Sequence, residues 1–255
     1  MIPLQTDLSI YKNLNLERPA IGMKYMFNRP EGIKQIDKSL AFCEMVKEAQ
    51  QRSEPFYFSK ENEDCAGKNA LGMEETSVAA AAGQVGGGGR IFQDDRANSS
   101  LIYSVYQNFP KPVKGTINYV AYAQLDKLTF EPDLLVIVGT ARQAEIVMRA
   151  MSYTTGELYR SVVSCVFACA SLYVYPYQTG NVNYVVTGMT FGMRSKEVFP
   201  EGLVLISIPY HWIPAVTQSL NVMNWVPEAF TQGREEFIKH EKKVMRDLKR
   251  RTGGG

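Results

Sequence analysis

Two of the four cysteines, Cys165 and Cys169, lie four residues apart in the stretch SCVFACASLYVYPYQTG, residues 164–180. The first part of this stretch is rich in small residues and compatible with a helix over 164–173. Residues i and i+4 share one face of a helix, so such a helix would direct both thiols toward one place. The aromatic turn YVYPY, which carries Tyr175 and Tyr177, follows immediately.

The remaining cysteines, Cys43 and Cys65, are far from this pair in the sequence. No Cys-x-x-Cys occurs, which excludes the spacing of a zinc ribbon, a thioredoxin-like pair and a ferredoxin-type run. A metal or an iron–sulfur cluster also accepts thiolates from distant segments when the fold brings them together. The alternative is that the cysteines only fill the interior, because cysteine is small and often buried. Cys65 fits that alternative least, since Asp64 and Gly67 flank it in a polar loop.

A second candidate site is the turn Gly139-Thr140-Ala141-Arg142, which joins an apolar strand to a helix. Free backbone N–H groups at the start of a helix favour anions, so this turn is a candidate cofactor-binding site. The alternative is an ordinary strand–helix turn. The glycine run at 83–89 lacks the Gly-Lys-Ser/Thr ending of a phosphate-binding loop. Two histidines are too few for a histidine-rich metal site.

The composition indicates a sizeable core and no general affinity for polyanions. The chain has 255 residues, of which 45% are hydrophobic, enough for one large domain or two small ones. Its net charge of +2 predicts no binding to nucleic acid. The N-terminus lacks the pattern of a secretory signal, and no apolar stretch approaches the roughly 20 residues of a membrane span. Four cysteines are too few for a disulfide framework, so we expect a cytoplasmic protein with reduced thiols.

The hydrophobic pattern predicts a mixed α+β fold, in which helices flank a twisted mixed sheet. The predicted strands are 20–27, 55–59, 118–125, 134–138, 183–187 and 203–208. The predicted helices are a short one within 1–18, then 39–52, 74–82, 97–106, 141–153, 164–173, 212–221 and 231–251. Two strand–turn–helix stretches, DLLVIVGTARQAEIVMRAM and GLVLISIPYHWIPAVTQSL, share a pattern, which indicates at most a weak internal duplication. We expect one domain over 1–230, a charged helix over 231–251 and a disordered tail at 252–255.

Several stretches, taken in order, resemble the domain-of-unknown-function 169 family of anaerobic bacteria and archaea. They are RPAIGMKY, AFCEMVKEAQ, EPFYFSKEN, DCAGKNALGM, FEPDLLVIVGTARQAEIVMRAMSYTTGE, CASLYVYPYQTGNVNYVVTGMTFGMR and LVLISIPY. The resemblance extends over about residues 8–225. It is interrupted at GQVGGGGRIFQDDRANSS, and the charged C-terminal helix lies beyond it.

The resemblance implies that Cys43, Cys65 and Cys169 are the shared thiols, whereas Cys165 matches less clearly. It implies an anaerobic setting but no reaction, so catalysis is left open. We therefore expect a metal- or cofactor-binding protein whose three shared thiolates hold an Fe–S cluster or a related metal centre. Cys165 would be a fourth ligand or a neighbouring thiol. The YVYPY turn, with Tyr175 and Tyr177, would form one wall of this site.

Two other functions stay open at this point. One is a non-catalytic carrier of an apolar, anionic cofactor such as a tetrapyrrole. Methionine- and tyrosine-rich walls would take its ring, and Arg142 or Arg90 its carboxylates. The other is an accessory subunit that docks on a larger enzyme through the helix Arg234–Arg251.

Overall fold

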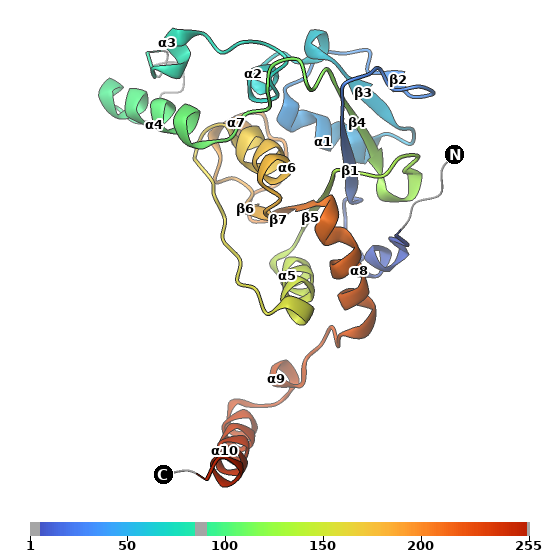
Figure 1. The fold of residues 1–255 in the computed structure, drawn as a ribbon, viewed down its shortest axis with the longest axis vertical. Coiled ribbons are helices and arrows are strands. Elements are labelled where there is room, and N and C mark those ends of the chain that lie inside the picture. Colours follow the sequence, from blue (N-terminus) through green and yellow to red (C-terminus); the bar gives the residue numbers. More distant parts are fainter. Residues whose placement is uncertain (1–5, 85–90, 254–255) are drawn as a thin grey trace. The chain divides into compact units, whose positions relative to one another are not determined.

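The computed structural model describes residues 6–84 and 91–253 (Figure 1). The strands are β1 (Ile21–Met26), β2 (Lys34–Gln35), β3 (Phe56–Phe58), β4 (Tyr119–Gln124), β5 (Leu134–Gly139), β6 (Asn183–Val186) and β7 (Val204–Pro209). The helices are α1 (Phe42–Gln51), α2 (Gly67–Ala70), α3 (Val78–Ala81), α4 (Asp95–Asn108), α5 (Ala141–Thr155), α6 (Tyr175–Thr179), α7 (Phe191–Ser195), α8 (Ile213–Val222), α9 (Glu228–Thr231) and α10 (Arg234–Arg251). A π-helical turn, Ala170–Val174, precedes α6. Most of the glycine run, together with Arg90, lies outside the described residues.

The seven strands form one sheet in the order β2-β3-β4-β1-β5-β7-β6. Only β2 and β3 run parallel, and the other neighbouring strands are antiparallel. The predicted mixed α+β fold is therefore confirmed. Each of the six predicted strands overlaps an observed one. β2 escaped prediction because it is two exposed polar residues long and leaves no alternating pattern.

Both faces of the central strands are covered, since every residue of β5 is buried. Alternate residues of β1, such as Met23 and Tyr25, join a core cluster with α1, α4 and the helical segment that contains the π turn. On β5, Leu134, Val136 and Val138 belong to the same cluster. Leu135 and Ile137 alternate with them and face the other side of the sheet, where α5 packs against β5 and β7. Cys43 belongs to the first of these layers, and Cys165 and Cys169 pack against it.

The two strand–turn–helix stretches that resemble each other are β5–α5 and β7–α8. Their strands are antiparallel neighbours, with Leu134 opposite Pro209 and Gly139 opposite Val204. Gly139 is the last residue of β5 and is buried. A side chain at this position would meet Leu16 and Gln143 within 3.0 Å, so the close packing at the turn between β5 and α5 requires glycine. The similarity of the two sequences thus corresponds to two adjacent elements of similar form.

The chain divides into two compact units, Met1–Asn221 and Val222–Gly255. The second unit contains α9 and α10, and α10 matches the predicted charged helix to within three residues. Its apolar residues Phe237, Val244 and Leu248 are about half exposed, at 47%, 49% and 50%. Of the predicted tail, residues 254–255 lie outside the described part. None of the described helices is long and apolar enough to cross a bilayer.

Candidate thiol site

The segment around Cys165 and Cys169 differs from the predicted helix over 164–173. Phe167 adopts a left-handed conformation with φ of 57°, so a helix cannot run through it, and the helical segment begins only at Ala168. Cys165 therefore precedes the helix, and it does not share a helix face with Cys169. Directly after Cys169 the backbone forms the π turn Ala170–Val174, a rare geometry that is frequent at functional sites.

Three cysteines from distant segments are brought into one electrostatic neighbourhood. Cys43 is buried in the first turn of α1, Cys65 is exposed just before α2, and Cys169 is the second residue of the helical segment. Burial raises the pKa of Cys43 to about 12, with a further contribution from Cys65. Burial likewise raises the pKa of Cys169 well above its usual value, and Cys43, Glu63 and Cys65 add to that rise. Cys165 is not among these principal contributors.

Cys169 retains some exposed surface, although protein atoms surround its thiol closely. These dense surroundings raise the pKa of the Cys169 thiol, because the cost of forming a thiolate depends on the groups that replace water around the sulfur. As the three thiols stand, Cys65 disfavours a negative charge on Cys43, and both disfavour one on Cys169. A cation placed among them would reverse that effect.

Glu63 holds the Cys65 loop against α1. It is the only buried charged residue among those described, at 2% exposure. Its Oε1 accepts the backbone N–H of Phe42 at 2.9 Å, at the start of α1. Its Oε2 accepts the N–H of Cys65 at 3.0 Å and that of Lys68 at 3.2 Å, in the first turn of α2. One carboxylate thus satisfies the starts of two helices and the backbone of one cysteine.

Gly67 allows this close approach. A Cβ at this position would lie 2.4 Å from the Cβ of Phe42 and 2.6 Å from Oε1 of Glu63. Both distances are shorter than packed atoms tolerate, so any larger residue would push α2 away from α1. The Cys-x-Gly pattern of the sequence therefore reflects a steric requirement at the site.

Three buried tyrosines line the interior side of the thiols. The hydroxyl of Tyr25 donates to the carbonyl of Tyr173 at 2.8 Å. The hydroxyls of Tyr122 and Tyr173 are buried without a hydrogen-bond partner among the described residues. Burial raises the pKa of both, and Cys169 adds to the rise in each case, so these phenols lie in the same neighbourhood as the thiols. Sequence analysis missed them, because aromatic residues in buried strands and helices give the same pattern as any core residue.

The outward side of the site carries Tyr106 and Lys196. Burial raises the pKa of Tyr106, with contributions from Cys169 and Cys65, and its ring lies 4.9 Å from that of Phe167. Lys196 forms an ion pair with Glu44 at 3.3 Å. Burial opposes the charge of Lys196, but Glu44, Asp64 and Cys65 outweigh it and raise its pKa. A cation thus stands beside the exposed thiol.

We expect iodoacetamide at pH 8 to modify Cys65 much faster than Cys43 in the folded protein. The thiolate is the nucleophile, and a pKa of about 12 leaves about one Cys43 thiol in ten thousand ionised at that pH. Peptide mass spectrometry after timed alkylation measures both rates. Equal rates at the two sites in folded protein would show that Cys43 is not shielded as described, and denatured protein provides the control.

At the predicted anion site, the start of α5, the side chains of Thr140 and Gln143 form hydrogen bonds with other groups of the protein. Thr140 caps the helix: its Oγ1 accepts the N–H of Gln143 at 3.3 Å, and Gln143 Oε1 accepts the N–H of Thr140 at 2.8 Å. Gln143 Nε2 also donates to the carbonyls of Leu14 and Asn15. Arg142 is exposed on the first turn. The turn therefore carries a complete capping box.

Tyr175 and Tyr177 project from α6 into different surroundings. The ring of Tyr177 packs on that of Tyr25, with centroids 4.1 Å apart, next to the tyrosines of the thiol site. Tyr175 instead lines a cavity with Arg160, Asn181 and Trp212. Gly139, Thr140 and Arg142 are not among the lining residues of that cavity.

Within residues 6–84 and 91–253, no three cysteine, histidine, aspartate or glutamate side chains are arranged to hold a metal ion as they stand. Of the three cysteines, Cys65 is the exposed one.

The model of a family described as uncharacterised ArCR matches residues 9–219 of the chain. The chain belongs to the domain-of-unknown-function 169 family. The matched range contains all four cysteines, and it ends before α9 and α10. An uncharacterized protein of Methanocaldococcus jannaschii is 26% identical over 204 residues, which cover 76% of this chain and 83% of the relative. No solved structure gives a significant match.

Proposed function

We propose that this member of the family is a cytoplasmic protein of anaerobic metabolism that holds an Fe–S cluster or a related metal centre. Cys43, Cys65 and Cys169 would be its ligands. The observation that carries the proposal is their convergence from three distant segments, since Cys65 contributes to the raised pKa of Cys43, and both contribute to that of Cys169. All four cysteines are free of disulfides, so each thiol is available as a ligand.

The chemistry of the surroundings fits such a group. Tyr122 and Tyr173 bring buried hydroxyls that lack a partner among the described residues, which is costly unless something accepts their hydrogen bonds. The sulfur atoms of a thiolate-bound centre are acceptors of this kind, and hydrogen bonds to them tune its potential. Lys196 supplies a positive charge near Cys65, which would complement the negative charge of a thiolate-bound centre.

A bound centre would supply electron transfer or an open iron, since three protein thiolates leave one iron of a cubane without a protein ligand. The chain's own residues would hold and release protons. Cys43 and Cys169 are protonated at neutral pH, so they must lose their protons when they bind metal. Binding should therefore strengthen as the pH rises.

Anaerobic reconstitution tests this proposal. Full-length protein is treated with ferrous iron and sulfide, and in separate arms with ferrous iron or zinc alone, followed by metal, sulfide and visible-absorption analysis. We expect stoichiometric iron and sulfide in the first arm and at least a tenfold loss of bound iron in Cys43→Ser, Cys65→Ser or Cys169→Ser. Cys165→Ser is the matched control. Colourless, metal-free protein in every arm would overturn the proposal.

The carrier of an apolar, anionic cofactor stays a second candidate, because Tyr177 and Tyr25 add an aromatic wall beside the thiols. Titration of the same metal-free protein with a tetrapyrrole, followed by absorbance, distinguishes the two. Saturable tetrapyrrole binding that survives Cys65→Ser would favour the carrier.

We also propose that α10 docks the protein on a larger enzyme. The helix forms part of a separate unit, and the exposed stripe of Phe237, Val244 and Leu248 has the spacing of a helix that packs against a partner. Acidic residues begin the helix and basic residues end it, which would fix the direction of docking. A chain that lacks residues 231–251 should no longer co-purify with its partner enzyme; retention would contradict this role.

A further inference from the structure

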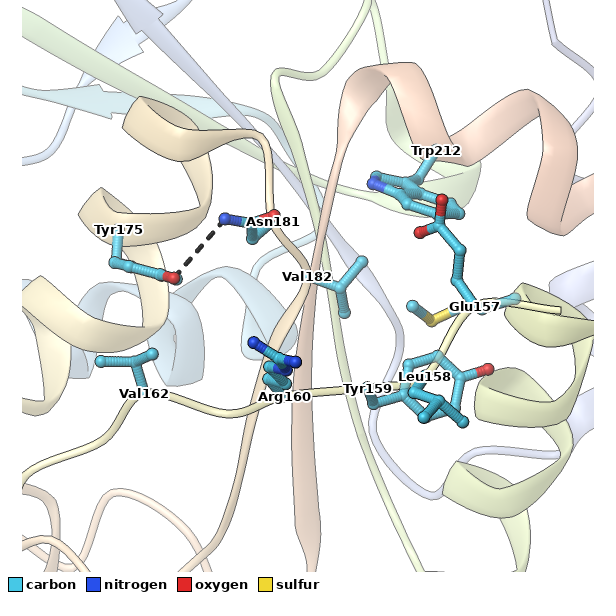
Figure 2. A pocket seen from close by; sticks show the side chains of 10 residues that line it. Glu157, Leu158, Tyr159, Arg160, Val162, Tyr175, Asn181, Val182 and Trp212 are labelled. Carbon is cyan, nitrogen blue, oxygen red and sulfur yellow. Dashed lines mark hydrogen bonds between the residues drawn. The ribbon is translucent and has the colours of Figure 1, made fainter. Parts of the chain in front are cut away.

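A cavity of about 390 Å³ lies apart from the thiols, in the first unit (Figure 2). Its walls come from the end of α5, the loop 156–163, α6, the turn after α6 and the turn before α8. This volume is within the range of small-molecule sites. The proposed metal centre makes no use of it.

The loop that closes the cavity is anchored at both ends. Near its start, the Oγ of Ser152 lies 2.9 Å from the carbonyl of Glu157 and 2.8 Å from the hydroxyl of Tyr159. Near its end, the buried amide of Asn183 accepts the N–H of Val162 and donates to its carbonyl, each at 2.9 Å. The backbone on either side of Arg160 is therefore held in place before a ligand arrives, which lowers the entropic cost of ordering the loop on binding.

Two aromatic side chains form opposite walls. The indole of Trp212 is fixed by a 3.1 Å hydrogen bond from Nε1 to the carbonyl of Gly180. Gly180 has a φ of 71°, and a Cβ there would meet the ring of His211 at 2.9 Å, so glycine allows the turn to approach His211 closely. On the other side, the hydroxyl of Tyr175 faces the amide of Asn181 at 3.5 Å.

The charge in the cavity comes from Arg160 and Glu157. Figure 2 shows Arg160 between the Tyr175–Asn181 wall and the Trp212–Glu157 wall. The guanidinium of Arg160 forms no ion pair with any described residue. An unpaired guanidinium recognises carboxylate or phosphate through two parallel hydrogen bonds, and aromatic walls favour a flat ligand.

We propose that this cavity binds a small planar organic anion, with its carboxylate or phosphate on Arg160 and its ring between Trp212 and Tyr175. Arg160 supplies the charge and the orientation, and the aromatic walls supply the apolar surface. Glu157, on the same loop, excludes ligands with a second anionic group near the indole.

Direct binding measurements test this proposal on full-length, metal-free protein. Trp212 and Trp225 are the two tryptophans, so a Trp225→Phe background makes Trp212 the only indole reporter. The probes are benzoate and phenyl phosphate, with uncharged benzamide for comparison, and isothermal titration calorimetry accompanies the fluorescence. We expect saturable binding of at least one anion and at least tenfold weaker binding of benzamide.

Arg160→Gln should weaken binding of the anion about tenfold or more, and Arg160→Lys should recover only part of the loss because lysine cannot form the bidentate pair. Arg96→Gln, an exposed arginine of α4, is the control. The proposal would be overturned if neither method detected binding of benzoate or of phenyl phosphate. It would also be overturned if Arg160→Gln bound the anion as tightly as the unchanged protein. The protein in this experiment carries no metal, so failure of the anion to bind would leave the proposed metal centre at the thiols untouched.

Discussion

Replacement of Glu63 by alanine is expected to lower the free energy of unfolding by about 3 kcal/mol, since hydrogen bonds to a charged acceptor contribute about 1.5–3 kcal/mol each and are not additive. The variant leaves the N–H groups of Phe42 and Lys68 without their acceptor at two helix starts. It also frees the backbone of Cys65. Urea denaturation followed by circular dichroism measures the change.

Two further variants separate the causes of this loss. Asp64→Ala removes an exposed neighbouring carboxylate and should change stability by less than about 0.5 kcal/mol. Glu63→Gln keeps the shape but turns an acceptor into a donor that faces backbone N–H groups, so it should recover little of the stability. If Glu63→Ala unfolded at the same urea concentration as the unchanged protein, the buried carboxylate would not hold the Cys65 loop.

Much of the fold could be predicted because its signals are local. The run Leu134–Gly139 is continuously apolar, and β5 is buried on both faces. Thr140 and Gln143 form the capping box that begins α5 directly after that strand. Where hydrophobic periodicity and an end signal coincide, as in these two elements, the sequence determines the element almost to the residue.

The thiol site could be predicted only in part, because its geometry depends on contacts between distant segments. The helical spacing of Cys165 and Cys169 is locally plausible, but the left-handed Phe167 ends that pattern. No periodicity marks Glu63, which the sequence does not distinguish from the neighbouring carboxylates Glu61 and Asp64, although Glu63 alone is buried. The resemblance to the family supplied Cys43, Cys65 and Cys169 together, which spacing alone could not.

Asn183 links the segment of the thiol site to the loop of the cavity. Its side-chain amide donates to the carbonyl of Ser171, inside the π turn that follows Cys169. The same amide holds Val162 at the end of the loop that carries Arg160. Asn183 is fully buried in the edge strand β6, so water cannot replace these bonds. Both proposed sites thus depend on one side chain that belongs to neither.

Asn183→Ala should lower the free energy of unfolding by about 2–4 kcal/mol, because each buried group left without a partner costs about 1–3 kcal/mol. The local effects distinguish this link from general destabilisation. In the folded variant we expect faster proteolysis within loop 156–163 and faster alkylation of Cys169, while Cys43 on α1 stays protected. Asn181→Ala, at an exposed position nearby, is the control. If Cys169 and Cys43 became reactive together, the variant would act through global unfolding, and the link through Asn183 would be wrong.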